Sequence, residues 1–168
     1  MISKQVCVVS DTSPLSAMAK MGWLPWLKER WGKVLVPDEV WRELSEMGDP
    51  DALAALSAAR SEGWLEVRSG RTVSRAEFIG LHAGEVEALA LAIALRAAWV
   101  IVDDGDARRV ALTLGLRIIG VLGMIVWAKQ HGKVANALDS IAELRRITQF
   151  RISDEVLGKI ALDLEETP

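Results

Sequence analysis

The stretch from Val6 to Ser16 constrains the fold most, because a short apolar run leads directly into an aspartate and a helix start. Such a run, rich in valine and ended by turn residues, is typical of a buried strand. Asp11 follows where this strand leaves the carboxyl edge of a sheet, the edge at which open α/β sheets bind ligands. Ser13 and Pro14 then predict a helix, with Ser13 as its N-cap and Pro14 at its first helical position.

Four further short apolar runs predict strands, and helical patterns separate them. The strands are expected at residues 34–36, 64–67, 99–102 and 117–119, and the helices at about 14–20, 25–30, 37–47, 50–61, 85–96, 107–114 and 121–130. Segment 68–80 has no clear period and predicts a loop. This alternation predicts an α/β fold, a three-layer α/β/α sandwich with a central parallel sheet. Right-handed crossovers would bring the carboxyl ends of its strands to one edge.

The length and composition predict one packed domain. The chain has 168 residues, of which 51% are hydrophobic. We expect residues 1–168 to form a single domain, with a core at about 6–130 and C-terminal helices at about 135–165. Cys7 is the only cysteine, which excludes an internal disulfide and a cysteine zinc cluster.

The charge and hydropathy patterns restrict the location and the partners. The net charge of −3 provides no global basic field, so a nucleic-acid site must be a local patch. No long apolar stretch follows a basic start, so no signal peptide is expected. The apolar run 88–102 contains Arg96 and is too short to span a bilayer. We therefore expect a cytoplasmic protein that does not contact a membrane.

Acidic residues occur at the ends of several predicted elements. They are Asp11, Glu43, the pair Glu85 and Glu87, and the cluster Asp103, Asp104 and Asp106. A glutamate within an apolar helix, such as Glu87, is costly unless it is paired or bound to metal. Converging carboxylates repel one another, and Mg²⁺ or Mn²⁺ relieves this repulsion because both ions prefer oxygen ligands. Such a site can activate water and stabilise a phosphodiester transition state.

Each acid also has an ordinary structural explanation. Asp11 could cap the first helix, and the Asp103–Asp106 cluster could form a turn and an N-cap. Glu85 could be a favourable charge in the first turn of its helix, and Glu43 and Glu87 could face solvent. The order of the acids and their positions at element ends favour a shared function.

Four segments contain the acids and follow one another along the chain. They are Val9-Ser10-Asp11-Thr12-Ser13-Pro14-Leu15, Val36-Pro37-Asp38-Glu39-Val40-Trp41-Arg42-Glu43-Leu44, Gly84-Glu85-Val86-Glu87-Ala88-Leu89-Ala90-Leu91-Ala92 and Ile101-Val102-Asp103-Asp104. In this order the segments resemble the motifs of PIN-domain nucleases, and the third is similar to the GExEA motif of a VapC-like toxin subgroup. The resemblance covers about residues 6–130, and the four motifs in this order are more specific than any one alone.

The resemblance implies a small α/β/α domain and Mg²⁺- or Mn²⁺-dependent endoribonuclease activity. VapC-like toxins are held inactive by a small antitoxin protein and are often dimeric, so an antitoxin partner and a homodimer are expected. Asp11 and Glu43 match the first two acids of the family. The last acid matches Asp103 or Asp104, and the third matches Glu85 or Glu87.

These matches lead to a hypothesis for the site. Asp11, Asp103 and one of Glu85 and Glu87 would hold the metal. Glu43 would position a second metal or the attacking water. The number of metals and the RNA target stay open.

Polar and basic residues near these acids are candidates for substrate binding. Thr12 and Ser13 lie beside the first acid and could bind phosphate or metal-bound water, although helix capping explains them equally well. Arg42 and Arg108, or Arg109, could contact phosphate, or could simply be solvated on the surface.

The main alternative is a non-catalytic RNA-binding or partner-binding module on the same fold. The presence of all four acidic positions argues against it. A haloacid dehalogenase would need a second aspartate at position 13, which is serine. A receiver domain would carry its paired acids at the first strand, and a dinucleotide-binding domain would have a glycine-rich turn there. Trp23, Trp26 and Trp31 could pack in the core or bind an antitoxin helix or a second subunit.

Overall fold

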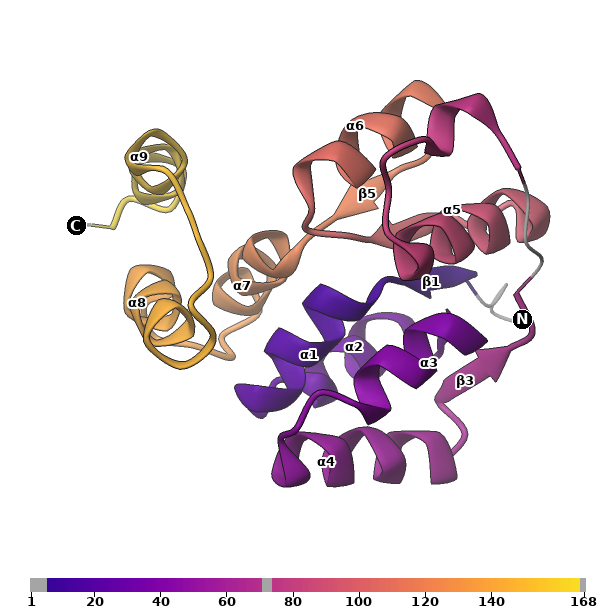
Figure 1. Ribbon diagram of the computed structural model, residues 1–168. Helices are drawn as coiled ribbons and strands as arrows, with labels where there is room; N and C mark the ends of the chain where they lie inside the picture. Colours follow the sequence, from indigo (N-terminus) through magenta and orange to yellow (C-terminus); the bar gives the residue numbers. More distant parts are fainter. Residues whose placement is uncertain (1–5, 71–73, 167–168) are drawn as a thin grey trace, which may run out of the picture. The chain divides into compact units, whose positions relative to one another are not determined.

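The computed structural model describes residues 6–70 and 74–166, and the chain forms two compact units (Figure 1). The first unit runs to Gly120 and alternates strands with helices. The second begins at Val121 and, in its described residues, contains helices alone.

The first unit is built on a parallel sheet that contains all five predicted strands. The strands are β1 (Val8–Ser10), β2 (Val34–Pro37), β3 (Leu65–Arg68), β4 (Trp99–Ile101) and β5 (Ile118–Ile119). Their order across the sheet is β3-β2-β1-β4-β5, and every pairing is parallel. The expected α/β class is therefore confirmed.

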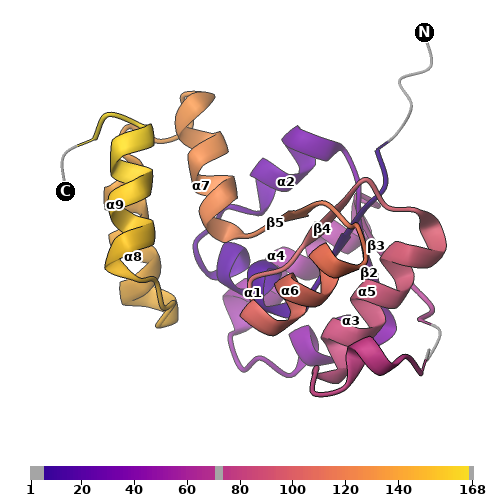
Figure 2. The same ribbon diagram turned by 90° about the horizontal axis from the view of Figure 1, so that it is seen from above.

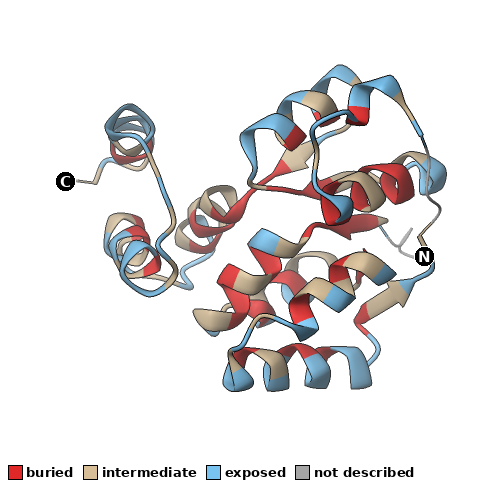
Figure 3. Cartoon of the chain, viewed as in Figure 1, coloured by how far each residue is buried: buried red, intermediate tan, exposed pale blue. Residues whose placement is uncertain are grey.

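Helices cover both faces of this sheet (Figures 1 and 2). On one side lie α1 (Thr12–Lys20), α2 (Leu24–Trp31), α3 (Asp38–Ser45) and α4 (Pro50–Ser61), and on the other α5 (Ala83–Leu95) and α6 (Gly105–Thr113). Strand residues Val9, Leu35 and Val100 pack with α5 in one buried cluster. Figure 3 shows buried residues along the strands and along the helix surfaces that face them. The arrangement is the expected three-layer sandwich.

Two local predictions need correction. Helix α1 begins at Thr12, and the extended residue before it is Asp11 (φ −82°, ψ 173°), so Ser13 is not the N-cap. Pro14 still fits, because residues in the first turn have no intrahelical acceptor for an amide proton. The predicted loop 68–80 contains a short 3₁₀ helix, Ala76–Phe78, with Phe78 buried; its residues 71–73 lie outside the described part.

The strand order places two predicted acids at one point of the sheet. The chain fills the positions from β1 to β3 and then crosses to the other side of β1 to form β4. In such sheets ligands bind at the carboxyl ends of the strands where the order reverses. The amide of Asp11 donates to the carbonyl of Ile101 at 3.0 Å, which joins the ends of β1 and β4. Asp11 and Asp103 therefore follow adjacent strands.

The second unit contains α7 (Val121–Gln130), α8 (Ala137–Thr148) and α9 (Asp154–Asp163). Ser153 is the N-cap of α9, since its Oγ accepts from the amide of Val156 at 3.3 Å. Glu166 follows α9 and accepts hydrogen bonds from the first amides of α8. None of the described helices combines the length and apolar character that crossing a bilayer would require.

Candidate active site

Asp11 is the most buried acid of the predicted set, with 3% of its surface exposed. Burial, together with the charges of Glu85, Glu43 and Asp103, raises the pKa of Asp11 to about 7, although a hydrogen bond from the Thr12 backbone lowers it. Three of the predicted carboxylates thus lie close enough to Asp11 to repel its charge.

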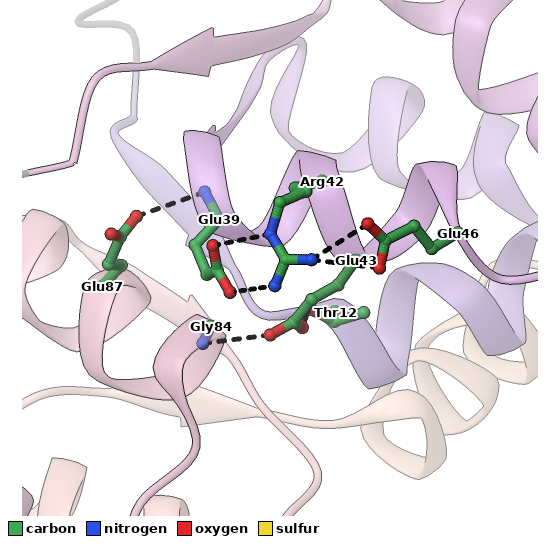
Figure 4. Close-up of polar contacts among 7 residues, drawn as sticks. All are labelled: Thr12, Glu39, Arg42, Glu43, Glu46, Gly84 and Glu87. Carbon is green, nitrogen blue, oxygen red and sulfur yellow. Dashed lines mark hydrogen bonds and ion pairs between the residues drawn. The ribbon is translucent and has the colours of Figure 1, made fainter.

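Glu43, on α3, is fixed from two sides (Figure 4). Its Oε1 accepts from the amide of Gly84 at 3.2 Å, and its Oε2 accepts from the hydroxyl of Thr12. A Cβ on Gly84 would lie 2.7 Å from Glu43 Oε2, so glycine is what allows this approach. Thr12 therefore orients an acid of the site.

Glu85 lies in the first turn of α5 and is buried, with 7% of its surface exposed. Its Oε2 accepts from the amide of His82, the N-cap residue, at 2.9 Å. Burial raises the pKa of Glu85, and the charges of Asp104 and Glu43 contribute to this rise. The hydrogen bond from the His82 amide lowers the pKa, but the net shift is upward. A second carboxyl of the site is thus less acidic than usual.

Glu87 has different surroundings, although it is only two residues from Glu85. Its side chain is half-buried, and its Oε2 accepts from the amide of Glu39 at 3.2 Å (Figure 4). Glu85 is the member of the pair whose charge acts on Asp11.

Asp103 and Asp104 are adjacent in sequence but have different structural roles. Asp103 is half-buried beside Gly120, where a Cβ would collide with its Oδ1. Asp104 is exposed and caps α6, since its Oδ1 accepts from the amides of Asp106 at 2.9 Å and Ala107 at 3.0 Å. Asp103 is the one whose charge raises the pKa of Asp11.

The predicted substrate-binding residues divide into inner and outer positions. Arg108 is half-buried and donates from Nη1 to the carbonyl of Val102 at 2.9 Å, next to Asp103. Arg42 is exposed and forms ion pairs of 2.5 Å with Glu39 in the first turn of α3 and of 3.0 Å with Glu46 at its C-cap.

Ser13 and Arg109 lie on the outer surface as well. Ser13 is exposed, and Arg109 pairs with Asp106 at 2.7 Å. Arg108 is therefore the arginine of this group that borders the buried acids.

The donor set is suited to a hard cation, although the side chains are not gathered into a closed ligand cage. Among the described residues, no three His, Cys, Asp or Glu side chains converge as a metal-binding cluster. The charges that raise the pKa of Asp11 belong to three carboxylates, whose oxygens are potential metal donors. A divalent cation would relieve this repulsion and favour the ionised form of Asp11.

Sequence reasoning missed the backbone groups that shape the site. Gly84 donates to Glu43, and Gly120 leaves room for Asp103. One available signal was that Gly84 directly precedes an acid at a helix start. A second signal in the sequence was that Glu85 lies three residues after His82. At this spacing a glutamate side chain can reach back to the amide of the N-cap residue.

Comparisons with known proteins identify the family. A family model described as a PIN domain (DUF3368) matches residues 7–166. A solved structure of a PilT N-terminus domain protein from the hyperthermophilic archaeon Sulfolobus solfataricus P2 is similar, with a TM-score of 0.51 and 20% identity over 71% of this chain and 90% of that chain. At this identity the likeness supports the fold alone. No curated protein matches the chain. PIN domains are generally nucleases, and because the family model spans both units, the chain belongs to the PIN domain family.

Proposed function

We propose that the chain is a Mg²⁺- or Mn²⁺-dependent endoribonuclease that hydrolyses RNA phosphodiester bonds. The observation that carries this proposal is Asp11, a buried carboxyl surrounded by three other carboxylates at the reversal point of a parallel sheet. A buried, strongly perturbed carboxyl is costly to keep, and such groups concentrate at functional sites.

The residues that would hold the cation are Asp11, Asp103 and Glu85. They supply oxygen ligands, which Mg²⁺ and Mn²⁺ prefer. A bound ion would lower the pKa of water and stabilise the charge of the phosphodiester transition state. Hydrolysis adds water to phosphorus and releases the RNA oxygen with a proton, so it needs no redox partner.

Glu43 and Arg108 would act on the reactants. Glu43 has a fixed orientation, because Thr12 and the Gly84 amide hold its two oxygens, so it can orient the attacking water. Arg108 lies beside Asp103 and would contact a phosphate oxygen of the substrate.

The direct test is cleavage of a mixed panel of structured and single-stranded RNAs by purified protein with Mn²⁺ or Mg²⁺. We expect cleavage that EDTA abolishes and that Asp11→Asn lowers by at least about 10³-fold, since charge stabilisation at the reacting centre would be lost. Asp51→Asn is the matched control, because Asp51 is an exposed acid in the first turn of α4. Full activity in folded Asp11→Asn would overturn the assignment, and no cleavage by folded wild type would shift support to a binding module.

We further propose that the nuclease is the toxin of a type II toxin–antitoxin pair, with a small antitoxin and a homodimeric state. The stacked, half-buried rings of Trp23 and Trp26, 4.7 Å apart, offer an aromatic surface for such a partner. Expression of the wild type should arrest growth, and expression of Asp11→Asn should not. Normal growth with active nuclease would reject the toxin role, and a strictly monomeric native mass would reject the dimer.

A further inference from the structure

Helices α3 and α5 exchange hydrogen bonds in a reciprocal way (Figure 4). Glu43 on α3 accepts from the amide of Gly84, in the first turn of α5. Glu87 on α5 accepts from the amide of Glu39, in the first turn of α3. Amides in the first turn have no intrahelical acceptor, so each helix supplies the other with a missing partner.

Both carboxylates lie against glycines. A Cβ on Gly84 would lie 2.7 Å from Glu43 Oε2, and a Cβ on Gly70 would collide with Glu87 Oε2. Gly70 follows β3, so Glu87 lies between the backbone beyond that strand and the start of α3. Two separate backbone segments thus leave space for the two carboxylates.

The ion pairs on the exposed side of α3 do not connect this helix to α5. The side chain of Glu39 is paired with Arg42, which also pairs with Glu46. These ion pairs join residues of α3 and its C-cap. The amide of Glu39 is the group of this residue that reaches α5, through Glu87.

We propose that Glu87 is a positioning residue and not a metal ligand: it holds the start of α3 against α5, so that Glu43, one turn further along α3, faces Asp11. This proposal rests on the proposed nuclease function for its effect on catalysis. The contact itself is independent of that function.

The two roles make different demands on the side chain. An acceptor for one amide can be a neutral carbonyl, so glutamine preserves it and alanine removes it. A ligand of Mg²⁺ or Mn²⁺ needs the carboxylate, so glutamine and alanine should then be similarly harmful. The pair Glu87→Gln and Glu87→Ala therefore separates positioning from metal binding.

The first readout is the rate of RNA cleavage at saturating Mn²⁺. We expect Glu87→Gln to keep kcat within about threefold of wild type, because the hydrogen bond survives. Glu87→Ala should lower kcat by roughly 10- to 100-fold, because a small displacement of a reacting group has effects of this size. Glu143→Ala is the control, since Glu143 is a surface acid of α8 paired with Arg146. Equal losses in the Gln and Ala variants would overturn the proposal.

The second readout does not require activity. Mn²⁺ binding, measured by calorimetry, should change less than about threefold in both Glu87 variants and fall at least tenfold in Glu85→Gln, which removes a charged ligand. Amide hydrogen exchange at Glu39 should quicken in Glu87→Ala and stay slow in Glu87→Gln. Loss of Mn²⁺ binding in Glu87→Gln, or unchanged exchange in Glu87→Ala, would reject the positioning role. If the wild type cleaves no RNA, amide exchange still tests whether Glu87 holds the amide of Glu39. Failure of the nuclease proposal can therefore be distinguished from failure of the positioning proposal.

Discussion

Asp11 and Glu166 both carry carboxyl groups that are shielded from solvent, but the groups around Asp11 are negatively charged and those around Glu166 are hydrogen-bond donors and a lysine. Asp11 is 3% exposed and faces three other carboxylates, and burial with these charges raises its pKa to about 7. The side chain of Glu166 is 5% exposed. Burial alone would raise its pKa, but the amides of Ala137 and Leu138 together with Lys129 outweigh burial and lower it.

The ionised form of Glu166 therefore stabilises the native state, whereas the ionised form of Asp11 destabilises it. Glu166 accepts at 2.9 Å from Ala137 and at 3.0 Å from Leu138, at the positive end of α8, and forms a 3.0 Å ion pair with Lys129. Asp11 repels its charged neighbours when it is ionised. Burial alone therefore does not mark an acid as a candidate functional residue, whereas burial combined with repulsion from other carboxylates does.

The sharpest test of this comparison is the response of stability to loss of the Asp11 charge. At pH 8 and without metal, Asp11→Asn should raise the free energy of unfolding by up to about 4 kcal/mol, since each unit of pKa shift corresponds to ~1.4 kcal/mol. The same change should remove RNA cleavage. Urea unfolding of wild type, Asp11→Asn and the control Asp51→Asn measures it. A clear loss of stability in Asp11→Asn would show that the charge of Asp11 does not destabilise the native state.

The pH dependence of stability should differ in sign for the two acids. Between about pH 4 and pH 7 the native protein keeps a proton on Asp11 that the unfolded chain has lost, so Asp11 makes stability fall as pH rises, by up to ~1.4 kcal/mol per unit. Glu166 contributes stability above its unfolded pKa of 4.5 and loses it as pH falls through the lowered native value. Unfolding of metal-free wild type and Asp11→Asn from pH 4 to pH 8 should give curves that converge near pH 4. Parallel curves would contradict the raised pKa.

Divalent cations should stabilise the acidic site and not the second unit. At Mn²⁺ concentrations of 100 times Kd, mass action should add about 2.7 kcal/mol to the free energy of unfolding of wild type and of Glu166→Gln. Asp11→Asn should gain much less, because a ligand is lost. Thermal unfolding with Mn²⁺, and again with EDTA, measures the difference. An equal gain in Asp11→Asn would place Mn²⁺ elsewhere.

The smallest expected effect concerns Glu166. Glu166→Gln should lower stability by about 1 to 2 kcal/mol, since it removes the charge from hydrogen bonds to helix amides and from an ion pair. The matched control is the adjacent Glu165→Gln, at an exposed position. Amide exchange within α8 should quicken in Glu166→Gln alone. Equal exchange in both variants would show that Glu166 is not a stabilising contact.

The layout of the first unit could be read from sequence because its signals are local. Each predicted strand is a short apolar run. An aspartate before a proline is a local signal of a helix start, and Asp49 Oδ1 accepts from the amide of Ala52 at 3.0 Å at the start of α4. The start of α1 was misplaced because Asp11, Thr12 and Ser13 all suit an N-cap. The choice among them depends on where β1 ends in the sheet.

The choice between Glu85 and Glu87 could not be made from sequence for a different reason. Two residues apart on a helix are turned by about 200°, so the two side chains face different neighbours. Helix α5 is apolar on most sides, so no single stripe shows which side meets the sheet. The partner of Glu87 is the amide of Glu39, on another helix. Such contacts exist only after the helices pack.

The order in which the acids occur along the chain sets when the site is completed during synthesis. Asp11 is made early, but Asp103 follows β4, and each residue of β4 lies 91 positions after its partner in β1, as the register of Val8 with Trp99 and Ser10 with Ile101 shows. At ~5 to 20 residues per second, this interval lasts about 5 to 20 s. A growing chain therefore lacks the complete acidic site until β4 and Asp103 have been made.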